Sequence, residues 1–466
     1  MLSAALFAAV VASPPNIVLI LIDDMGWTDV GVYGSKYYET PNIDHLAETG
    51  VMFTQGYAAC AVCSPTRYSI VTGKYPARSG ITDWLRPLEG TPFDQAAIRS
   101  KPPYEGGKNQ PLLTPTLASW MEKSETTIAE VLKKQGYATG FIGKWHLGPV
   151  GYWPENQGFD WNLGGCSFGH PPDYFDPYPA KHQAVTFPNL APRKEGEYLT
   201  DRLTDEAVGF IERNKDRPFF LELAHYAVHA PIEAKADLIA KYRNKPTTNQ
   251  KVPAYAAMVE SVDDSVGAIV HTLERLGLRE NTLLVFTSDN GGAVHFAATS
   301  NLPLRLGKGY PYEGGIREPF IVSWPDQIPA GQVSNSAICS IDLFPTFAAA
   351  ANANYTNKVD GVDLLPLMEH GTPLKKRFLT WHYPHYWAGL VQPYSIIRSG
   401  PFKLIHLYEG DRYELYDVAS DISESHDLSN ERPDLVNYLK ARLASELKAQ
   451  GARFPIKNPD FHPGGS

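Results

Sequence analysis

A short segment beginning at Cys63 carries the residue types best suited to chemistry in this chain. It has the sequence CSPTR, ends at Arg67, and is followed by Thr72-Gly73. A cysteine is a candidate nucleophile, so Cys63 is a candidate catalytic residue. Cys60 and Cys63 also form a C-x-x-C pair, which elsewhere marks a redox centre or half of a zinc site. The chain has four cysteines and no second C-x-x-C, which makes the redox and zinc interpretations the weaker ones.

Chemically active side chains also follow four predicted strands, at the point where each strand ends. The strands cover residues 16–22, 138–143, 218–223 and 282–286. Each residue after them has a structural alternative, such as a helix cap or an Asx turn. In open α/β sheets, however, ligands bind beyond the carboxyl ends of the strands. Their joint placement predicts one site, formed by Asp23, Asp24, Lys144, His146, His229, Asp289 and Asn290.

Apolar strand-like runs alternate with helix-like segments at residues 127–135, 203–214 and 255–276. This alternation predicts an α/β fold with a large, mostly parallel or mixed central sheet between helices. From about residue 377 the pattern changes to short alternating strands, and residues 433–450 form a predicted helix. We therefore expect a catalytic domain over residues 14–376 and a small C-terminal domain over 377–466, with an antiparallel sheet and one helix.

Length, charge and cysteine content limit the classes of protein to consider. The chain has 466 residues and a net charge of −9, which argues against nucleic acid as the main partner. Four cysteines are too few for a disulfide-dense scaffold. Residues 1–13 are apolar and end in small residues, so they resemble the remnant of a secretory signal. No later segment is long enough to span a membrane, so we expect a periplasmic or secreted protein.

Several longer segments point to one family when taken with the Cys63 segment. They are TPNID at 40–44, GKWHLG at 143–148 and YEGGIREP at 312–319. In this order they resemble the type I, formylglycine-dependent sulfatases of the alkaline phosphatase superfamily, and bacterial polysaccharide sulfatases in particular. The resemblance extends from about Pro15 to Tyr416-Asp417. It implies an alkaline-phosphatase-like fold and an enzyme that hydrolyses sulfate esters.

The resemblance also implies a cofactor and a modified residue. A formylglycine-generating maturation enzyme would oxidise Cys63, and the modified residue would join Asp23, Asp24, Asp289 and Asn290 around a metal ion. These four side chains offer oxygen ligands, which suit a hard cation such as Ca²⁺ and make zinc a poor fit. Mg²⁺ prefers oxygen ligands too, so the ligand types leave it open.

By the same resemblance, the remaining site residues have separate roles. Lys144 and Lys308 would contact the sulfate oxygens, and Arg67 would hold the formylglycine and nearby charge. His229, with Lys308, lies where the family donates a proton to the leaving oxygen. His146 lies where the family has the base that deprotonates the second hydroxyl of the hydrate.

The expected substrate is a sulfated carbohydrate with galactose or N-acetylgalactosamine units. Segments 80–125 and 160–200 are rich in Gly, Pro and aromatic residues and are predicted to be long loops over the strand ends. A phosphate or phosphonate ester hydrolase of the same superfamily is an alternative. A glycan-binding protein without catalysis is another, if Cys63 stays unmodified. Candidate substrate contacts, besides Lys144, His229 and Lys308, are Asp83, Trp84, His170, His382 and His385.

Overall fold

The computed structural model describes residues 13–86, 102–178 and 186–462. The predicted signal remnant at 1–13 therefore lies outside the described residues except for Ser13. Among the described helices, none combines the length and the apolar character needed to cross a membrane.

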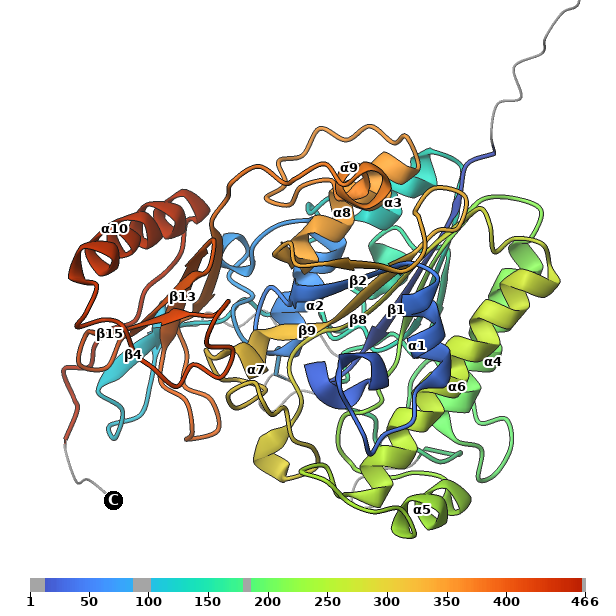
Figure 1. The fold of residues 1–466 in the computed structure, drawn as a ribbon, viewed down its shortest axis with the longest axis horizontal. Coiled ribbons are helices and arrows are strands. Elements are labelled where there is room, and N and C mark those ends of the chain that lie inside the picture. Colours follow the sequence, from blue (N-terminus) through green and yellow to red (C-terminus); the bar gives the residue numbers. More distant parts are fainter. Residues whose placement is uncertain (1–12, 87–101, 179–185, 463–466) are drawn as a thin grey trace, which may run out of the picture.

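A large mixed sheet forms the centre of the larger, N-terminal part of the molecule (Figure 1). In the described part of the chain it has nine strands, in the order β10-β2-β9-β8-β1-β7-β5-β6, with β11 also paired to β2. Their bounds are β1 (Asn16–Ile22), β2 (Val51–Tyr57), β5 (Ala138–Gly143), β6 (Trp161–Leu163), β7 (Phe219–Ala224), β8 (Thr282–Ser288), β9 (Arg317–Ser323), β10 (Gln332–Ser334) and β11 (Ile338–Cys339).

Strands β8, β1, β7, β5 and β6 are parallel neighbours, whereas β9 runs antiparallel to both β8 and β2. All seven residues of β1 are buried, as expected for a strand covered on both faces. The predicted fold class is confirmed. The predicted strands at 16–22 and 138–143 have the predicted bounds, because a continuous apolar run with polar residues after it is a strong local signal.

Helices cover both faces of this sheet. Val18, Ile20 and Ile22 of β1 face a core shared with α1, α4 and α6, and the alternate residues of β1 face α2, α3 and α8. Figure 1 shows α4 and α6 on one side and α3 and α8 on the other. The helices are α1 (Pro41–Glu48), α2 (Cys63–Thr72), α3 (Ile128–Lys134), α4 (Leu199–Asn214), α5 (Ala236–Arg243), α6 (Pro253–Arg275), α7 (Glu313–Ile316), α8 (Leu343–Ala350) and α9 (Leu365–His370). Short 3-10 helices are η1 (Trp27–Asp29), η2 (Gly31–Tyr33), η3 (Pro76–Arg78), η4 (Pro154–Asn156), η5 (Val294–Phe296) and η6 (Ser340–Asp342).

The C-terminal segment forms a separate antiparallel sheet. Its strands are β12 (Leu379–Tyr383), β13 (Tyr394–Ser399), β14 (Phe402–Leu407) and β15 (Arg412–Asp417). Helix α10 (Pro433–Gln450) packs on one face of the sheet through Leu439, Leu443 and Leu447. The other face packs against Ala61 and Val62, directly before Cys63. The second sheet therefore supports the segment that carries the candidate nucleophile.

Segment 80–125, predicted to be a long loop, contains two strands in its described part. β3 (Tyr104–Glu105) and β4 (Leu112–Pro115) form a small sheet with β16 (Ile456–Lys457). The loop prediction is corrected there. β4 pairs with the nearby β3 and also with β16 near the end of the chain, and a local sequence pattern cannot reveal a partner as distant as β16.

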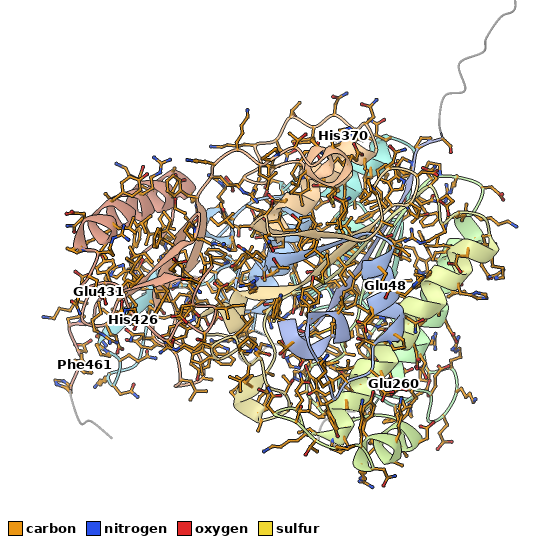
Figure 2. The ribbon with its side chains drawn as sticks, in the orientation of Figure 1. Glu48, Glu260, His370, His426, Glu431 and Phe461 are labelled. Carbon is orange, nitrogen blue, oxygen red and sulfur yellow. The ribbon has the colours of Figure 1, made fainter. Side chains whose placement is uncertain are left out.

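A buried cluster of charges joins the two domains. The Lys403 ammonium of β14 lies 3.1 Å from the Glu313 carboxylate of α7 and 2.8 Å from that of Glu424. Glu313 also accepts a 2.6 Å hydrogen bond from the hydroxyl of Tyr57. Some charged side chains pair at the surface instead, such as His426 with Glu431, both labelled in Figure 2. Because the side chains of Lys403, Glu313 and Glu424 are fully buried, each charge depends on its partners.

Lys403→Met is expected to destabilise the protein by about 3–5 kcal/mol, because it leaves the buried Glu424 carboxylate without its cation and leaves Glu313 with Arg317 as its cation. Chemical unfolding measures the change. Lys440→Met is the matched control, since Lys440 is exposed and 3.9 Å from Asp411. That control should cost less than about 1 kcal/mol. Equal losses in the two variants would contradict a buried interdomain ion pair.

Candidate active site

The structure brings the predicted strand-end residues together at one edge of the central sheet. Asp23-Asp24 follow β1, and Asp289-Asn290 follow the neighbouring strand β8. Lys144 follows β5, and its ammonium lies 2.6 Å from Asp23 Oδ2. Lys308 reaches the same place from the loop before α7, with its ammonium 2.6 Å from Asp24 Oδ1. The residues that follow β1, β5 and β8 converge because these strands run in parallel and their carboxyl ends lie at one edge of the sheet.

Helix α2 adds Cys63 and Arg67 to this cluster. Cys63 is the first residue of the helix, and Arg67 lies one turn later on the same side. The Arg67 guanidinium donates to Asp289 Oδ2 at 2.8 Å and to the carbonyl of Lys144 at 2.6 Å. Gly73 ends the helix at φ 68°, in the left-handed region that favours glycine. The CSPTR spacing thus places the cysteine beside a fixed cation.

Three buried oxygen atoms in the cluster have no hydrogen-bond partner among the described residues. They are Asp23 Oδ1, Asp24 Oδ2 and Asn290 Oδ1. Their side chains are at most 1% exposed, and an unpaired buried oxygen is costly. Because hard cations bind such oxygens, these residues fit a Ca²⁺ or Mg²⁺ ion. Asp289 belongs to the same cluster through Arg67, and its Oδ1 lies 3.3 Å from the backbone nitrogen of Asp24.

The electrostatics of the two aspartates agree with a place for a cation. Burial raises the pKa of Asp23 to about 8; the Lys144 ammonium opposes that rise, and the Asp289 and Asp24 carboxylates add to it. Burial also raises the pKa of Asp24, but Lys308 and His229 outweigh it and hold the pKa below its usual range. A divalent cation among these groups would favour the ionised carboxylates.

His146 is held with one ring nitrogen free. Its Nε2 lies 2.8 Å from the carbonyl oxygen of Leu85, which makes Nε2 the donor, while Nδ1 is buried and unpartnered in the described chain. Burial and the charge of Lys144 lower the pKa of His146 well below its usual value. Its backbone has φ 57°, a strained conformation that turns the chain after β5. The result is a neutral imidazole with an available lone pair.

The His229 side chain lies beside Asp24 and is more exposed than the carboxylates. Its Nε2 is 3.6 Å from Asp24 Oδ2, and its Nδ1 lies 2.8 Å from the carbonyl of Ala230. Ligand atoms of Asp23, Asp24 and His229 lie within 4.8 Å of one another. The sequence placed no histidine among the metal ligands, so the nearness of His229 comes from the fold alone. Burial and Lys308 lower the pKa of His229 well below its usual value.

Two of the five additional substrate-binding candidates have side chains that are not fully buried, and one of them contacts a site residue. His170 is exposed and stacks on His229, with ring centroids 6.1 Å apart. Trp84 is partly buried and lies under the guanidinium of Arg86.

The other three candidates are engaged by the protein itself. Asp83 is buried and accepts from the Tyr383 hydroxyl at 2.7 Å. His385 Nε2 lies 2.7 Å from the Thr82 hydroxyl. His382 lies in β12, where Nδ1 meets the Ser395 hydroxyl and Nε2 the Arg453 carbonyl, so both ring nitrogens are occupied. Asp83 and His385 thus attach segment 82–84 to the C-terminal domain, and a substrate role for these three stays a prediction.

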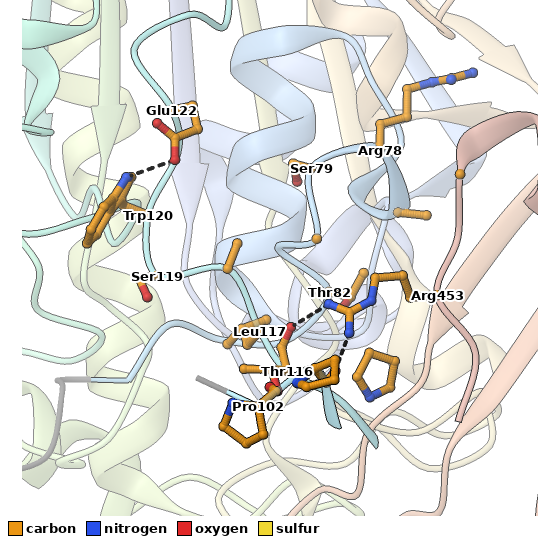
Figure 3. Close-up of a pocket in the computed structure, with 16 residues that line it drawn as sticks. Arg78, Ser79, Thr82, Pro102, Thr116, Leu117, Ser119, Trp120, Glu122 and Arg453 are labelled. Carbon is orange, nitrogen blue, oxygen red and sulfur yellow. Dashed lines mark hydrogen bonds between the residues drawn. The ribbon is translucent and has the colours of Figure 1, made fainter. Parts of the chain in front are cut away.

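A cavity of about 760 Å³ lies beside this segment but contains none of the cluster residues. Figure 3 shows Thr82, Trp120 and Arg453 on its wall. The Trp120 indole donates to Glu122, and the Arg453 guanidinium donates to the Thr116 carbonyl. The cavity is separate from the carboxylates and cations that define the candidate active site.

One residue near the cluster was missed by the sequence analysis. His295 in η5 lies close enough to Asp24 and Lys308 for both charges to act on its pKa. Its ring packs on Trp387 of the C-terminal domain, with centroids 4.7 Å apart. The one sequence signal for His295 is its place shortly after the DNGG segment at 289–292. Its contact with Trp387 could not be predicted, because Trp387 is distant in sequence.

Comparison with known proteins agrees with this geometry. Residues 15–353 match the sulfatase family model, and residues 306–451 match the model of the N-sulphoglucosamine sulphohydrolase C-terminal region. A sulfatase of Formosa agariphila is 32% identical over 93% of this chain and 88% of that protein. The N-acetylgalactosamine-6-sulfatase of Mus musculus is 37% identical over 78% of this chain and 68% of its own length. The crystal structure of Ps i-CgsB in complex with k-i-k-neocarrahexaose has a TM-score of 0.78 and 30% identity, covering 95% of both chains.

The chain therefore belongs to the sulfatase family. It is an enzyme that hydrolyses sulfate esters, as the sequence resemblance implied.

Proposed function

We propose that this sulfatase acts on a sulfated carbohydrate, with Cys63 converted to formylglycine and Ca²⁺ bound by Asp23, Asp24, Asp289 and Asn290. The observation that carries the proposal is the convergence of unpartnered acidic and amide oxygens with the cations Arg67, Lys144 and Lys308 beside the first turn of α2. This combination suits a metal ion, a modified cysteine and an anionic substrate group in one place.

The carbohydrate part of the proposal rests on relatives and on the site's surroundings. One relative is named for N-acetylgalactosamine 6-sulfate, and one similar structure was solved with k-i-k-neocarrahexaose. We infer galactose or N-acetylgalactosamine units for this chain. The exposed His170 ring, which stacks on His229, supports a sugar as the leaving group.

Each chain residue then has a task that its contacts support. A formylglycine hydrate at position 63 would supply the attacking hydroxyl and a second hydroxyl whose deprotonation releases sulfate, and a bound Ca²⁺ would lower the pKa of the attacking hydroxyl. Lys144 and Lys308 stabilise the negative charge of the sulfate group. Both side chains are buried at the cluster, and a positive charge acts more strongly where water is excluded. Arg67 fixes Asp289 and the backbone after β5.

The two histidines divide the proton transfers. His146 accepts a proton through Nδ1, whose lone pair is free while Nε2 is bonded to Leu85. His229 donates a proton to the leaving oxygen. Lys308 lies close to His229, because both side chains contact Asp24. Binding of the anionic sulfate group favours the protonated imidazole of His229.

The proposal is tested with protein produced together with a formylglycine-generating enzyme. Mass spectrometry of the tryptic peptide ending at Arg67 should show a mass lower by the exchange of thiol for aldehyde oxygen. The same sample should release sulfate from 4-nitrophenyl sulfate and from 6-sulfated galactose or N-acetylgalactosamine. An unmodified thiol, or faster turnover of 4-nitrophenyl phosphate or a phosphonate ester, would contradict the proposal.

His229→Ala should slow sulfated sugars by about 10²–10⁴-fold and 4-nitrophenyl sulfate much less, because a poor leaving group needs the proton more. Steady-state kinetics on both substrates measure this difference. Calcium affinity is measured on the same variant, because His229 lies near the carboxylates. An equal loss on the two substrates, together with weaker calcium binding, would make His229 a metal ligand rather than an acid.

A further inference from the structure

Helix η5 forms one wall beside Lys308, and backbone contacts fix its position. The Lys308 backbone nitrogen donates to the carbonyl of Gly292 at 3.1 Å, and Val294 donates to the same carbonyl at 2.9 Å. A Cβ at Gly307 would come within 2.3 Å of the Gly292 oxygen and 2.9 Å of Val294 Cγ2. The Lys308 loop and η5 are therefore in direct contact, which places His295 next to a sulfate-contacting candidate.

Trp387 of the C-terminal domain completes this wall. Its ring lies on Gly309, where a Cβ would meet the indole at 2.4 Å, so only glycine fits beside Lys308. The Gly309 backbone nitrogen donates to the carbonyl of Ala61, two residues before Cys63. The indole is 7% exposed, and the His295 ring meets it edge to face at 82°. The Lys308 loop, η5 and the C-terminal domain thus pack against one another.

The His295 imidazole keeps its hydrogen-bonding capacity. The ring is partly exposed, no side-chain hydrogen bond to it occurs in the described part of the chain, and its Nδ1 is buried without a partner. Burial lowers the pKa of His295, Asp24 raises it and Lys308 lowers it further, so both charged groups act on this ring. In the neutral ring that burial favours, one nitrogen donates and the other accepts.

Apolar surface flanks this polar ring. Phe296, next to His295, is 60% exposed, and Leu390, in the turn between Trp387 and Val391, is 53% exposed. A few directed polar groups among apolar side chains are typical of a site for a small organic ligand. A sugar offers both apolar C–H faces and hydroxyl groups, whereas an aryl ring offers no hydroxyl.

We propose that His295, held by Trp387, contacts the leaving group of the sulfate ester and hydrogen-bonds a sugar hydroxyl next to the sulfated carbon. His295 thereby favours sulfated sugars over aryl sulfates. It would contact the sugar on the side of Lys308 that Trp387 covers. This inference rests on the proposed carbohydrate substrate. The role is one of substrate recognition, so it adds no proton transfer to the reaction.

The test compares His295→Phe with wild type on N-acetylgalactosamine 6-sulfate, galactose 6-sulfate and 4-nitrophenyl sulfate. Phenylalanine keeps a ring against Trp387 and removes both nitrogens. The expected result is a 10- to 100-fold lower kcat/KM on at least one sulfated sugar, mainly through KM, because a buried partner hydroxyl loses its bond. Turnover of 4-nitrophenyl sulfate should stay within about twofold of wild type.

His295→Gln should recover part of the loss, because glutamine keeps a donor and an acceptor. His370→Phe, on the exposed end of α9 (Figure 2), is the control and should match wild type. Thermal unfolding verifies that each variant is folded. Equal losses on sugar and aryl substrates, or no loss on either sugar, would overturn the role of His295. If wild type turns over no sulfate ester, the proposed function is overturned instead. If wild type turns over 4-nitrophenyl sulfate but neither sulfated sugar, the proposed substrate class is overturned.

Discussion

Cys63→Ala protein should lose hydrolysis of every sulfate ester, by about 10⁴-fold or more, because the proposed nucleophile is removed while the rest of the site stays in place. Cys63 is buried at the first turn of α2, and its removal leaves the contacts of Arg67 with Asp289 intact. Initial rates on 4-nitrophenyl sulfate and a sulfated sugar measure the loss, and a thermal unfolding curve like that of wild type shows that the fold is kept.

Cys60→Ser is the matched control, because Cys60 is also buried and lies three residues earlier. The proposed mechanism predicts near wild-type turnover for this variant, whereas a redox role for the C-x-x-C pair requires both cysteines. Cys63→Ser gives a second control. Its hydroxyl can take the sulfuryl group and release the alcohol, but serine has no second hydroxyl to expel sulfate. A single burst of product is expected at most, and sustained turnover would contradict the formylglycine route.

The second large effect concerns the proposed cation. Chelation of wild-type protein should abolish turnover and lower the melting temperature, and added Ca²⁺ should restore both. A ligand at 100 times its dissociation constant stabilises the folded state by about 2.7 kcal/mol. The buried, unpartnered oxygens of Asp23, Asp24 and Asn290 supply the reason, since the cation replaces hydrogen bonds that they lack. Calorimetric titration with Ca²⁺ and then Mg²⁺ identifies the preferred ion.

Asp24→Asn should weaken Ca²⁺ binding by about 10–100-fold or more, because it removes one negative charge from the ligand set. Glu260→Gln on α6 (Figure 2) is the control, because the Glu260 carboxylate pairs with Lys241 at 2.8 Å, and this variant should bind Ca²⁺ as wild type does. Unchanged melting temperature and activity after chelation, with Asp24→Asn equal to wild type, would show that these oxygens hold no cation.

Local patterns carried much of the fold. The strand at 16–22, predicted from its continuous apolar run, and the helix at 433–450 have the predicted bounds. Helix α4 begins at Leu199, earlier than the predicted 203, because tertiary packing of Leu199 extends it beyond the clearest part of the pattern. The direction of β9 could not be predicted from its local sequence. It runs antiparallel to β2 and β8, and this direction depends on strand pairing and not on the residues of β9 itself.

For the site, the sequence by itself determined which side chains stand at the strand ends and that Cys63 and Arg67 are one helical turn apart, because both follow from local spacing. Only the tertiary structure decided which candidates meet. It engages both nitrogens of His382 within the C-terminal domain, and it brings His295 and Trp387 together beside Lys308. Packing between distant segments sets such contacts, and no periodicity in the chain encodes them directly.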